Sequence, residues 1–302
     1  MASVGKVFGT VLIGVVVAIG LPPSASAYCL TYTCTSDGDS PDCVEDNGCE
    51  VGGKPLHWSS RCISFSVQAD GSPRRDIRLE DARRVIGGAF YTWTHAQCPD
   101  GANPAIEVFD LSPVSCRATE FDVEGGNANI WVFRDTFWPY DDTGTLALTT
   151  VTYNPASGEI FDADVEINTA ENQVTVGSRY AEYDLASIAT HEAGHVLGLS
   201  HSPNWSATMY AAYDVGSVTT RRLHLDDVHG ICAAIPPDRD VPDTCDPYPK
   251  TGFSAVCDDS SGGCAIAAAS PNSRGVGFTT LLLCGLVLRR CTGRRGRRAR
   301  DV

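Results

Sequence analysis

Apolar residues recur along the middle of the chain with two different periods, which predict strands and helices. Residues 62–67 alternate between apolar and polar side chains, as expected for a half-buried strand. Over 79–93 the apolar residues recur every three or four positions, which predicts an amphipathic helix. Two further helices are predicted, one that begins after a capping Asp184 and runs through Val196, and one at 225–234. Short apolar runs predict the remaining strands, at 105–109, 129–133, 146–153 and 160–167.

The order of these elements predicts the class of the fold. One strand and one helix come first, several strands follow, and two helices close the series. This order is typical of an α+β domain with a twisted, mixed and mostly parallel sheet and helices packed behind it. The patterned region, 58–236, is long enough to enclose one hydrophobic core. Residues 28–57 are rich in Cys, Asp and Gly, and indicate a disulfide-stapled segment ahead of that domain.

The first 27 residues have the pattern of a secretory signal. Lys6 precedes an apolar core at 7–20, and a small-x-small pattern ends at Ala27. An uncleaved membrane anchor is the alternative, and it is less favoured because the apolar run is shorter than the ~20 residues that span a bilayer. Cleavage after Ala27 is therefore expected.

The C-terminal region also separates from the domain by composition. Residues 237–263 are rich in Asp, Pro, Ser and Gly, which indicates a linker. From Cys264 to the end, 264–302 combines an apolar run with a terminal cluster of arginines. This combination indicates a sorting signal, or a C-terminal membrane anchor whose arginines stay in the cytoplasm.

Charge and cysteine content limit the environment of the protein. The formal net charge is −14, and eight of the twenty arginines lie in the tail, so the domain itself is more acidic still. Nucleic-acid partners are excluded, because they require a basic surface. Thirteen cysteines behind a secretory signal indicate an oxidising compartment. The early ones lack the tight pairing and histidines of a zinc ribbon, and are interpreted as structural disulfides, namely Cys29, Cys34, Cys43 and Cys49.

The eleven residues 191–201, HEAGHVLGLSH, carry the chemistry. His191 and His195 are four positions apart, so a helix projects both imidazoles from one face toward one zinc ion. Gly198 permits a sharp turn that brings His201 back as a third ligand. Three protein ligands leave a fourth position open, which is the catalytic rather than the structural arrangement. Glu192 is placed to act as the base toward the water that zinc activates.

This stretch and the residues after it resemble the metzincin zinc peptidases, and among them the matrixin family. Ser202 directly follows the third histidine, and 207–210 is similar to the matrixin Met-turn, with Met209 beneath the metal. The resemblance implies a protein or peptide substrate that adds as an antiparallel strand along 144–150. It also implies that an aspartate at the start of the last helix, Asp226 or Asp227, supports the Met-turn.

Two further assignments rest on resemblance. Asp162, Asp164 and Glu166 resemble the acidic matrixin segment that binds calcium, although a solvated acidic turn has the same composition. The tail at 264–302 resembles the sorting tails of myxobacterial surface proteins, which implies that Cys264 is a processing or lipid-attachment residue at the outer membrane. Unlike many matrixins, the chain has no histidine between His95 and His191 for a second, structural zinc, and no Pro-Arg-Cys-Gly motif for latency.

Together these features predict a secreted or surface-attached zinc endopeptidase. One alternative is a binding or adhesion module that keeps an inherited zinc site without turnover. Another is a zinc hydrolase that acts on something other than peptides. The presence of Glu192 favours turnover, because a relic site has no need of a base.

The odd number of cysteines gives the first testable prediction. Removal of the tail discards Cys284 and Cys291, and attachment or processing at Cys264 leaves ten cysteines, enough for five disulfides. Intact-mass analysis of protein from its native host should reveal the loss of 1–27, the loss of residues beyond the Cys264 region, and no free thiol among those ten. A mature protein that still ends at Val302 contradicts the sorting tail and leaves the peptidase assignment untouched.

Overall fold

The central layer of the chain is a six-stranded sheet. Its strands in spatial order are β12 (Arg297–Arg300), β7 (Ala147–Tyr153), β8 (Ile160–Ile167), β6 (Ile130–Phe133), β4 (Cys62–Val67) and β5 (Glu107–Asp110). The four strands from β8 to β5 are parallel, whereas β7 is antiparallel to both of its neighbours. The sheet is therefore mixed and mostly parallel.

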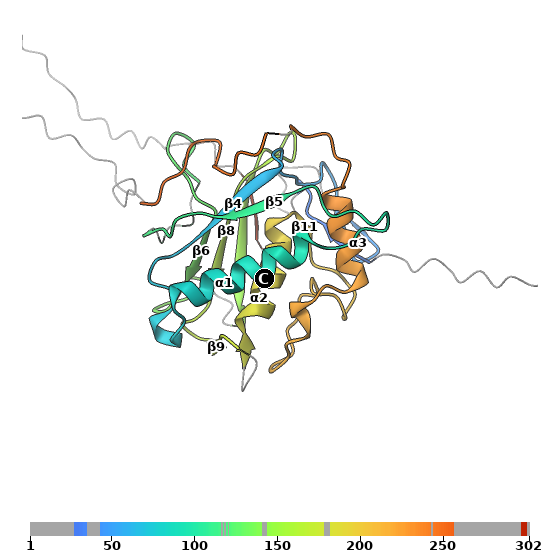
Figure 1. Cartoon of the computed structure of the whole chain (residues 1–302). Helices are drawn as coiled ribbons and strands as arrows, with labels where there is room; N and C mark the ends of the chain where they lie inside the picture. Colours follow the sequence, from blue (N-terminus) through green and yellow to red (C-terminus); the bar gives the residue numbers. More distant parts are fainter. Residues whose placement is uncertain are drawn as a thin grey trace, which may run out of the picture.

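Helices and short strand pairs surround this sheet in an α+β arrangement (Figure 1). The computed structural model describes residues 27–34, 43–115, 117, 119, 121–140, 144–177, 182–242, 244–256 and, for the backbone alone, 297–300. The helices are α1 (Leu79–Thr94), α2 (Leu185–Val196) and α3 (Leu225–Ala234), with short 3₁₀ turns η1 (Pro73–Arg75) and η2 (Thr219–Arg221). The short pairs are β1 (Cys29–Leu30) with β11 (Leu199–Ser200), β2 (Val44–Asp46) with β3 (Cys49–Val51), and β9 (Val174–Thr175) with β10 (Tyr183–Asp184).

The elements predicted from apolar periodicity are present within about two residues of their expected bounds. The N-terminus of α2 follows from its capping residue, since the Asp184 carboxylate accepts the backbone N–H of Ser187 at 2.8 Å. Helix α3 begins with a capping box in which His224 and Asp227 each accept a backbone N–H of the other. Local sequence thus sets where both helices begin.

The core forms where α1 and α2 cover the apolar face of the sheet (Figure 1). Phe90 of α1 stacks on Phe65 with ring centroids 5.1 Å apart, and meets the edge of Trp131 at 5.8 Å. Trp93, fully buried, donates its indole N–H to the carbonyl oxygen of Thr190 at 2.7 Å. This hydrogen bond connects α1 to α2 one residue before the first histidine of the motif.

The prediction of a half-buried strand at 62–67 is wrong, because every residue of β4 is buried. Its apolar side chains face the helices, and its serines face a second covered side of the sheet. The hydroxyl of Ser64 donates to the carbonyl oxygen of Pro247 at 2.6 Å, and a disulfide joins Cys62 to Cys245. The described part of the expected linker 237–263 therefore lies against the sheet and buries its polar face.

Eight cysteines of the described residues form four disulfides, as expected for an oxidising compartment. The bonds are Cys29–Cys49, Cys34–Cys43, Cys62–Cys245 and Cys98–Cys232. The last two connect positions 183 and 134 residues apart, so they close long loops and restrict the unfolded chain most. Cys116, Cys257 and the tail cysteines lie outside the described residues.

Most of the two terminal segments also lies outside the described residues, including the signal up to residue 26 and Cys264. The described part of the tail, β12, pairs with β7 from Thr150 to Tyr153. Strand β7 therefore has a neighbour on both sides over those positions, which overlap the edge strand expected at 144–150 only at Thr150. No helix among the described residues has the length and apolar character to cross a membrane.

Candidate metal centre

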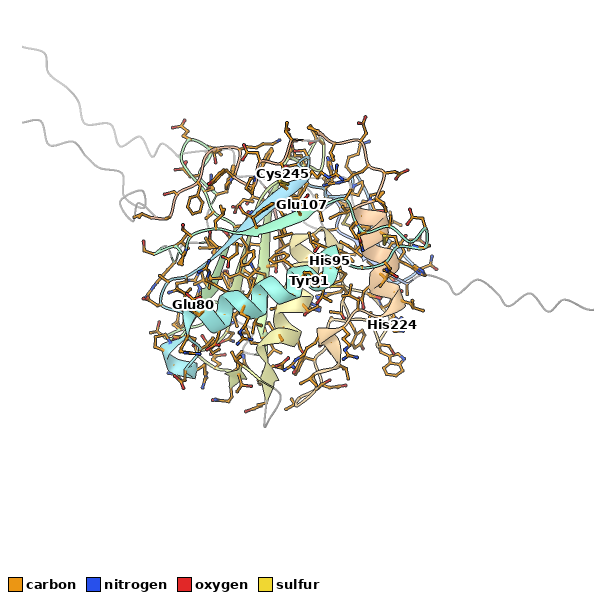
Figure 2. All side chains as sticks on the ribbon, viewed as in Figure 1. Glu80, Tyr91, His95, Glu107, His224 and Cys245 are labelled. Atoms are coloured by element: carbon orange, nitrogen blue, oxygen red, sulfur yellow. A yellow bond between two sulfur atoms is a disulfide. The ribbon has the colours of Figure 1, made fainter. Side chains whose placement is uncertain are left out.

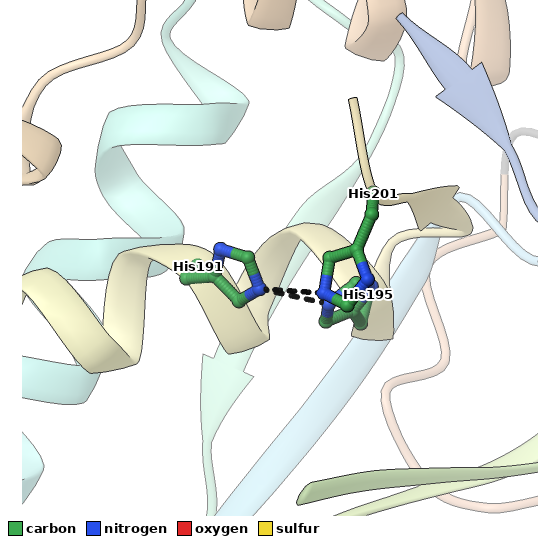
Figure 3. Close-up of side chains that lie close together, drawn as sticks. All are labelled: His191, His195 and His201. Atoms are coloured by element: carbon green, nitrogen blue, oxygen red, sulfur yellow. Dashed lines mark hydrogen bonds between the residues drawn. The ribbon is translucent and has the colours of Figure 1, made fainter. Parts of the chain in front are cut away.

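Three histidine side chains converge beside α2. The Nε2 atom of His191 lies 3.1 Å from that of His195 and 3.2 Å from that of His201 (Figure 3). Two nitrogens that bind one tetrahedral zinc ion at about 2.0–2.1 Å are about 3.3 Å apart, so this donor set fits zinc. The chain reaches His201 through a turn at Gly198, whose φ of 97° is left-handed and favours glycine. The structure thus brings together the three histidines named from the sequence.

The other ring nitrogen of two of these histidines meets a backbone carbonyl. His191 Nδ1 lies 2.7 Å from the carbonyl oxygen of Thr208, and His195 Nδ1 lies 2.9 Å from that of Leu199. Because a carbonyl oxygen only accepts, each Nδ1 carries the proton and each Nε2 presents its lone pair to the cluster. Neutral imidazole with a free Nε2 is the form that binds a metal.

Burial keeps these two imidazoles neutral. Burial, aided by the nearby His201, lowers the pKa of His195 to about 3. Burial also lowers the pKa of His191 well below its usual range, and His195 and His201 add to the effect. No proton therefore has to leave either ring before a cation binds at neutral pH.

Glu192 is held beside the histidines by the sheet. Its carboxyl group is buried, with only 5% of the residue exposed, and its Oε2 accepts a hydrogen bond of 2.5 Å from the hydroxyl of Thr149 on β7. A charge-assisted hydrogen bond of this kind is stronger than one between neutral groups and restrains the carboxylate. The position of Glu192 is therefore set jointly by α2 and β7.

Met209 lies buried against α2 at Gly194, and α3 fixes the turn that carries it. The Asp227 carboxylate accepts the backbone N–H groups of Thr208 at 2.8 Å and Met209 at 3.0 Å. The sequence left open which aspartate supports the turn, and the contacts assign that role to Asp227. Its neighbour Asp226 instead accepts the hydroxyl of Ser202 at 2.7 Å.

Gly194 is a requirement of this site that the sequence analysis missed. A Cβ at position 194 would lie 2.3 Å from the sulfur of Met209 and 2.8 Å from the ring of Trp93. Only glycine lets the Met-turn approach the helix backbone this closely. A glycine in the interior of a predicted helix was the available signal, since such a residue usually has a packing reason.

A cleft of about 390 Å³ opens beside the histidines. Its walls come from 144–147 ahead of and into β7, from α2, and from the chain after Met209. The segment after the Met-turn contributes Ala211, Ala212, Tyr213 and Thr220. His191, Glu192 and His201 all line the cleft, so a group that enters it reaches both the Glu192 carboxyl group and the histidine rings.

The three carboxylates expected to bind calcium lie outside the cleft, on the covered polar face of β8. Asp162, Asp164 and Glu166 are each no more than 2% exposed, so a solvated turn is excluded. Glu166 forms an ion pair with Arg134 at 2.5 Å and accepts the hydroxyl of Tyr140. Burial, with Asp162 as the next cause, raises the pKa of Asp164 well above its usual range.

His95 and His224 have partners outside the cluster of three histidines. His95 stacks on Tyr91 at the end of α1, with ring centroids 3.7 Å apart, and His224 caps α3 (Figure 2). A second cluster of ligand-type residues, Cys62, Glu107 and Cys245, lies at one end of β4 (Figure 2). Its two sulfurs form a disulfide, so they offer no thiolate to a metal.

Two threonines that support the site were also missed. Thr149 holds Glu192, and the Thr31 hydroxyl donates at 3.0 Å to Leu199 O, the carbonyl oxygen that meets His195. Both are more than forty positions from their partners in the chain, and periodicity gives no information on such contacts. The one available signal was that Thr149 lies in the stretch expected to border the cleft.

The sequence is similar to those of several known proteins. The family model for matrixin matches residues 57–234. The chain is 38% identical over 177 residues to metalloendoproteinase 1 of Glycine max, which covers 58% of this chain and 51% of that protein. It is 28% identical over 189 residues to matrix metalloproteinase-C of Caenorhabditis elegans, covering 60% of this chain and 29% of the relative.

The human matrix metalloproteinase-20 is 34% identical over 131 residues, which cover 41% of this chain and 25% of that protein. The chain thus spans about half or less of the length of these curated relatives. The family match covers more than half of the present chain and includes every residue of the histidine cluster. The chain therefore belongs to the matrixin family.

Proposed function

We propose that this chain is a zinc-dependent endopeptidase that hydrolyses peptide bonds in protein or peptide substrates. Zinc is held by His191, His195 and His201, Glu192 is the catalytic base, and Met209 forms the floor of the site. Membership of the matrixin family supports a zinc metallopeptidase. The observation that carries the proposal is the convergence of three Nε2 atoms at one end of a cleft that the buried carboxyl group of Glu192 also lines.

The chemistry divides between the metal and the side chains. When bound, zinc lowers the pKa of water toward about 7 and polarises the carbonyl group of the substrate. Glu192 takes the proton of the attacking water and delivers it to the leaving amine nitrogen. Thr149 keeps one oxygen of that carboxylate fixed by its hydrogen bond. The buried cleft wall strengthens these electrostatic contacts because little water competes with them.

The substrate lies extended along β7. The part of this strand nearest the cleft, from Ala147 to Thr149, has β8 on one side and no second strand on the other among the described residues. Its free backbone groups can pair with a peptide backbone, which explains why an extended peptide suits the site. The adjoining cleft then receives a side chain of that peptide.

Residues outside the catalytic part determine the location of the protein. We propose that 1–27 direct secretion, that 28–57 and 58–236 are the Cys-rich segment and catalytic domain, and that 237–263 leads to a sorting or anchoring tail at 264–302. Four disulfides support an extracellular location. A tail of the myxobacterial type attaches the protein at the outer membrane through Cys264.

A calcium ion at Asp162 and Asp164 is a second proposal, and it leaves out the third expected ligand, Glu166, because that carboxylate pairs with Arg134. Both carboxyl groups are buried and close enough to share a hydrogen bond, and the pKa of Asp164 is raised. Without a cation the folded state must keep a proton there, so stability falls as pH rises from the ordinary carboxyl range toward the raised pKa. Calcium replaces that proton with oxygen ligands and positive charge.

Replacement of the base separates turnover from binding. Glu192→Gln should reduce peptide cleavage by about 10²–10⁴-fold, because the attacking water loses its proton acceptor, while zinc content stays unchanged. The control is Glu80→Gln, a change at an exposed carboxylate of α1, and it should leave the rate unaltered. Cleavage of a mixed peptide library, with and without chelator, measures both. A Glu192→Gln variant with the rate of the control contradicts the assigned role.

Removal of a ligand should act on the metal itself. His201→Ala should lower zinc affinity by more than the roughly 10–100-fold that loss of a hydrogen-bonding support costs. His95→Ala removes an exposed histidine that stacks on Tyr91 and should retain full zinc content. Zinc is measured after dialysis against a competing chelator. Equal zinc content in the two variants rejects His201 as a ligand.

The calcium proposal makes a pH-dependent prediction. Millimolar calcium should raise the thermal midpoint of calcium-stripped protein, and more at pH 8 than at pH 5, because protons compete for the two carboxylates at low pH. Asp162→Asn should lose this response and keep the fold. No shift at pH 8 in the unchanged protein removes calcium from this site.

A further inference from the structure

The N-terminal Cys-rich segment lies directly against the loop between the second and third histidines of the metal centre. Strand β1 pairs antiparallel with β11, with Leu30 opposite Leu199 and Cys29 opposite Ser200. The backbone N–H of Thr31 donates to the carbonyl oxygen of Gly198 at 2.9 Å. The match to the matrixin model begins only at residue 57, so this contact comes from a part of the chain that the family does not account for.

One carbonyl oxygen in this loop accepts two hydrogen bonds. Leu199 O lies 2.9 Å from Nδ1 of His195 and 3.0 Å from the Thr31 hydroxyl. The oxygen has two lone pairs, so both donors can be satisfied at once. Since Leu199 is 1% exposed, water does not replace either donor freely. The direction of the Leu199 carbonyl therefore depends on the Thr31 hydroxyl as well as on the His195 ring.

The segment that carries Thr31 is itself fixed on both sides. The carbonyl oxygen of Thr31 accepts the backbone N–H of Leu56 at 2.8 Å, and a disulfide joins the nearby Cys29 to Cys49. Cys29 is buried, at 2% exposure. Because this backbone is restrained, the Thr31 hydroxyl is a donor at a fixed position. Little conformational entropy is lost when it binds the Leu199 carbonyl.

We propose that Thr31 is a positioning residue of the metal centre, acting through the Leu199 carbonyl to orient His195 toward zinc. The inference rests on the proposed function, because it requires zinc at the three histidines. Groups that orient a ligand from outside the coordination shell affect metal affinity and the ligand field without touching the metal. The Cys-rich segment is accordingly a permanent part of the site.

The test compares two threonines of the same segment in the full chain, Thr31, which is half-buried, and Thr33, which is buried. Thr31→Val removes the hydroxyl and keeps shape and strand preference, and Thr31→Ser restores the donor. The matched control is Thr33→Val, because the Thr33 hydroxyl accepts the backbone N–H of Lys54 at 3.0 Å within the segment itself. Zinc affinity is measured by competition with a chromophoric chelator, and the ligand field by the visible absorption of the cobalt-substituted protein.

Thr31→Val should bind zinc roughly 3–10-fold more weakly and shift the cobalt bands. The effect should be smaller than the loss of a group that hydrogen-bonds a metal-binding histidine directly, because Thr31 acts on His195 only through the Leu199 carbonyl. Thr31→Ser and Thr33→Val should match the unchanged protein in both measurements. If Thr31→Val does not fold, as judged by its near-ultraviolet circular dichroism, Thr31→Ala carries the same test with a smaller side chain.

Two outcomes overturn the inference, and they differ in what else they affect. Equal zinc affinity and equal cobalt spectra in Thr31→Val and Thr33→Val reject Thr31 as a positioning residue and leave the peptidase proposal standing. Failure of the unchanged protein to bind zinc rejects the proposed function and this inference together.

Discussion

The orientation of two imidazoles by two backbone carbonyls is the constraint on which the rest of the structure depends. His191 and His195 present Nε2 to one point only because Thr208 and Leu199 hold their Nδ1 protons. Each carbonyl belongs to a loop, and each loop is held by a different secondary-structure element. Asp227 of α3 anchors the first loop, and the pairing of β1 with β11 anchors the second. A single hydrogen bond of this kind contributes only about 1 kcal/mol to stability, so its main effect here is geometric.

The sequence predicts best what is local. Helix bounds follow from apolar period and from caps such as Asp184, and the histidine triad follows from spacing within eleven residues. The hydrogen bonds that Thr149 and Thr31 donate could not be predicted, because their acceptors are 43 and 168 positions away in the sequence. The burial of both faces of β4 could not be predicted for a related reason. Serines in a strand indicate a solvent-exposed face, and only the structure shows that the segment around Pro247 covers them.

That second covered face also changes the extent of the structural unit. The matrixin match ends at 234, yet the segment from Cys245 to Val256 packs on the polar side of the sheet. A smaller apolar cluster forms there around Val114, Ile130 and Val132, in contact with Phe253. At the other end, β1 and its disulfide complete the surroundings of the histidines. The family-sized domain is thus the middle of a larger unit that both flanks help to close.

The pairing of β1 with β11 bears on the order in which the site can assemble. A chain delivered from its N-terminus presents Thr31 long before Leu199, which lies 168 residues later. Contacts between such distant segments form late in folding, since the intervening loop must close first. The N-terminal segment therefore has no β11 to pair with until nearly all of the domain has been synthesised. An unfinished chain therefore lacks both the third histidine and the contact that β1 makes beside it.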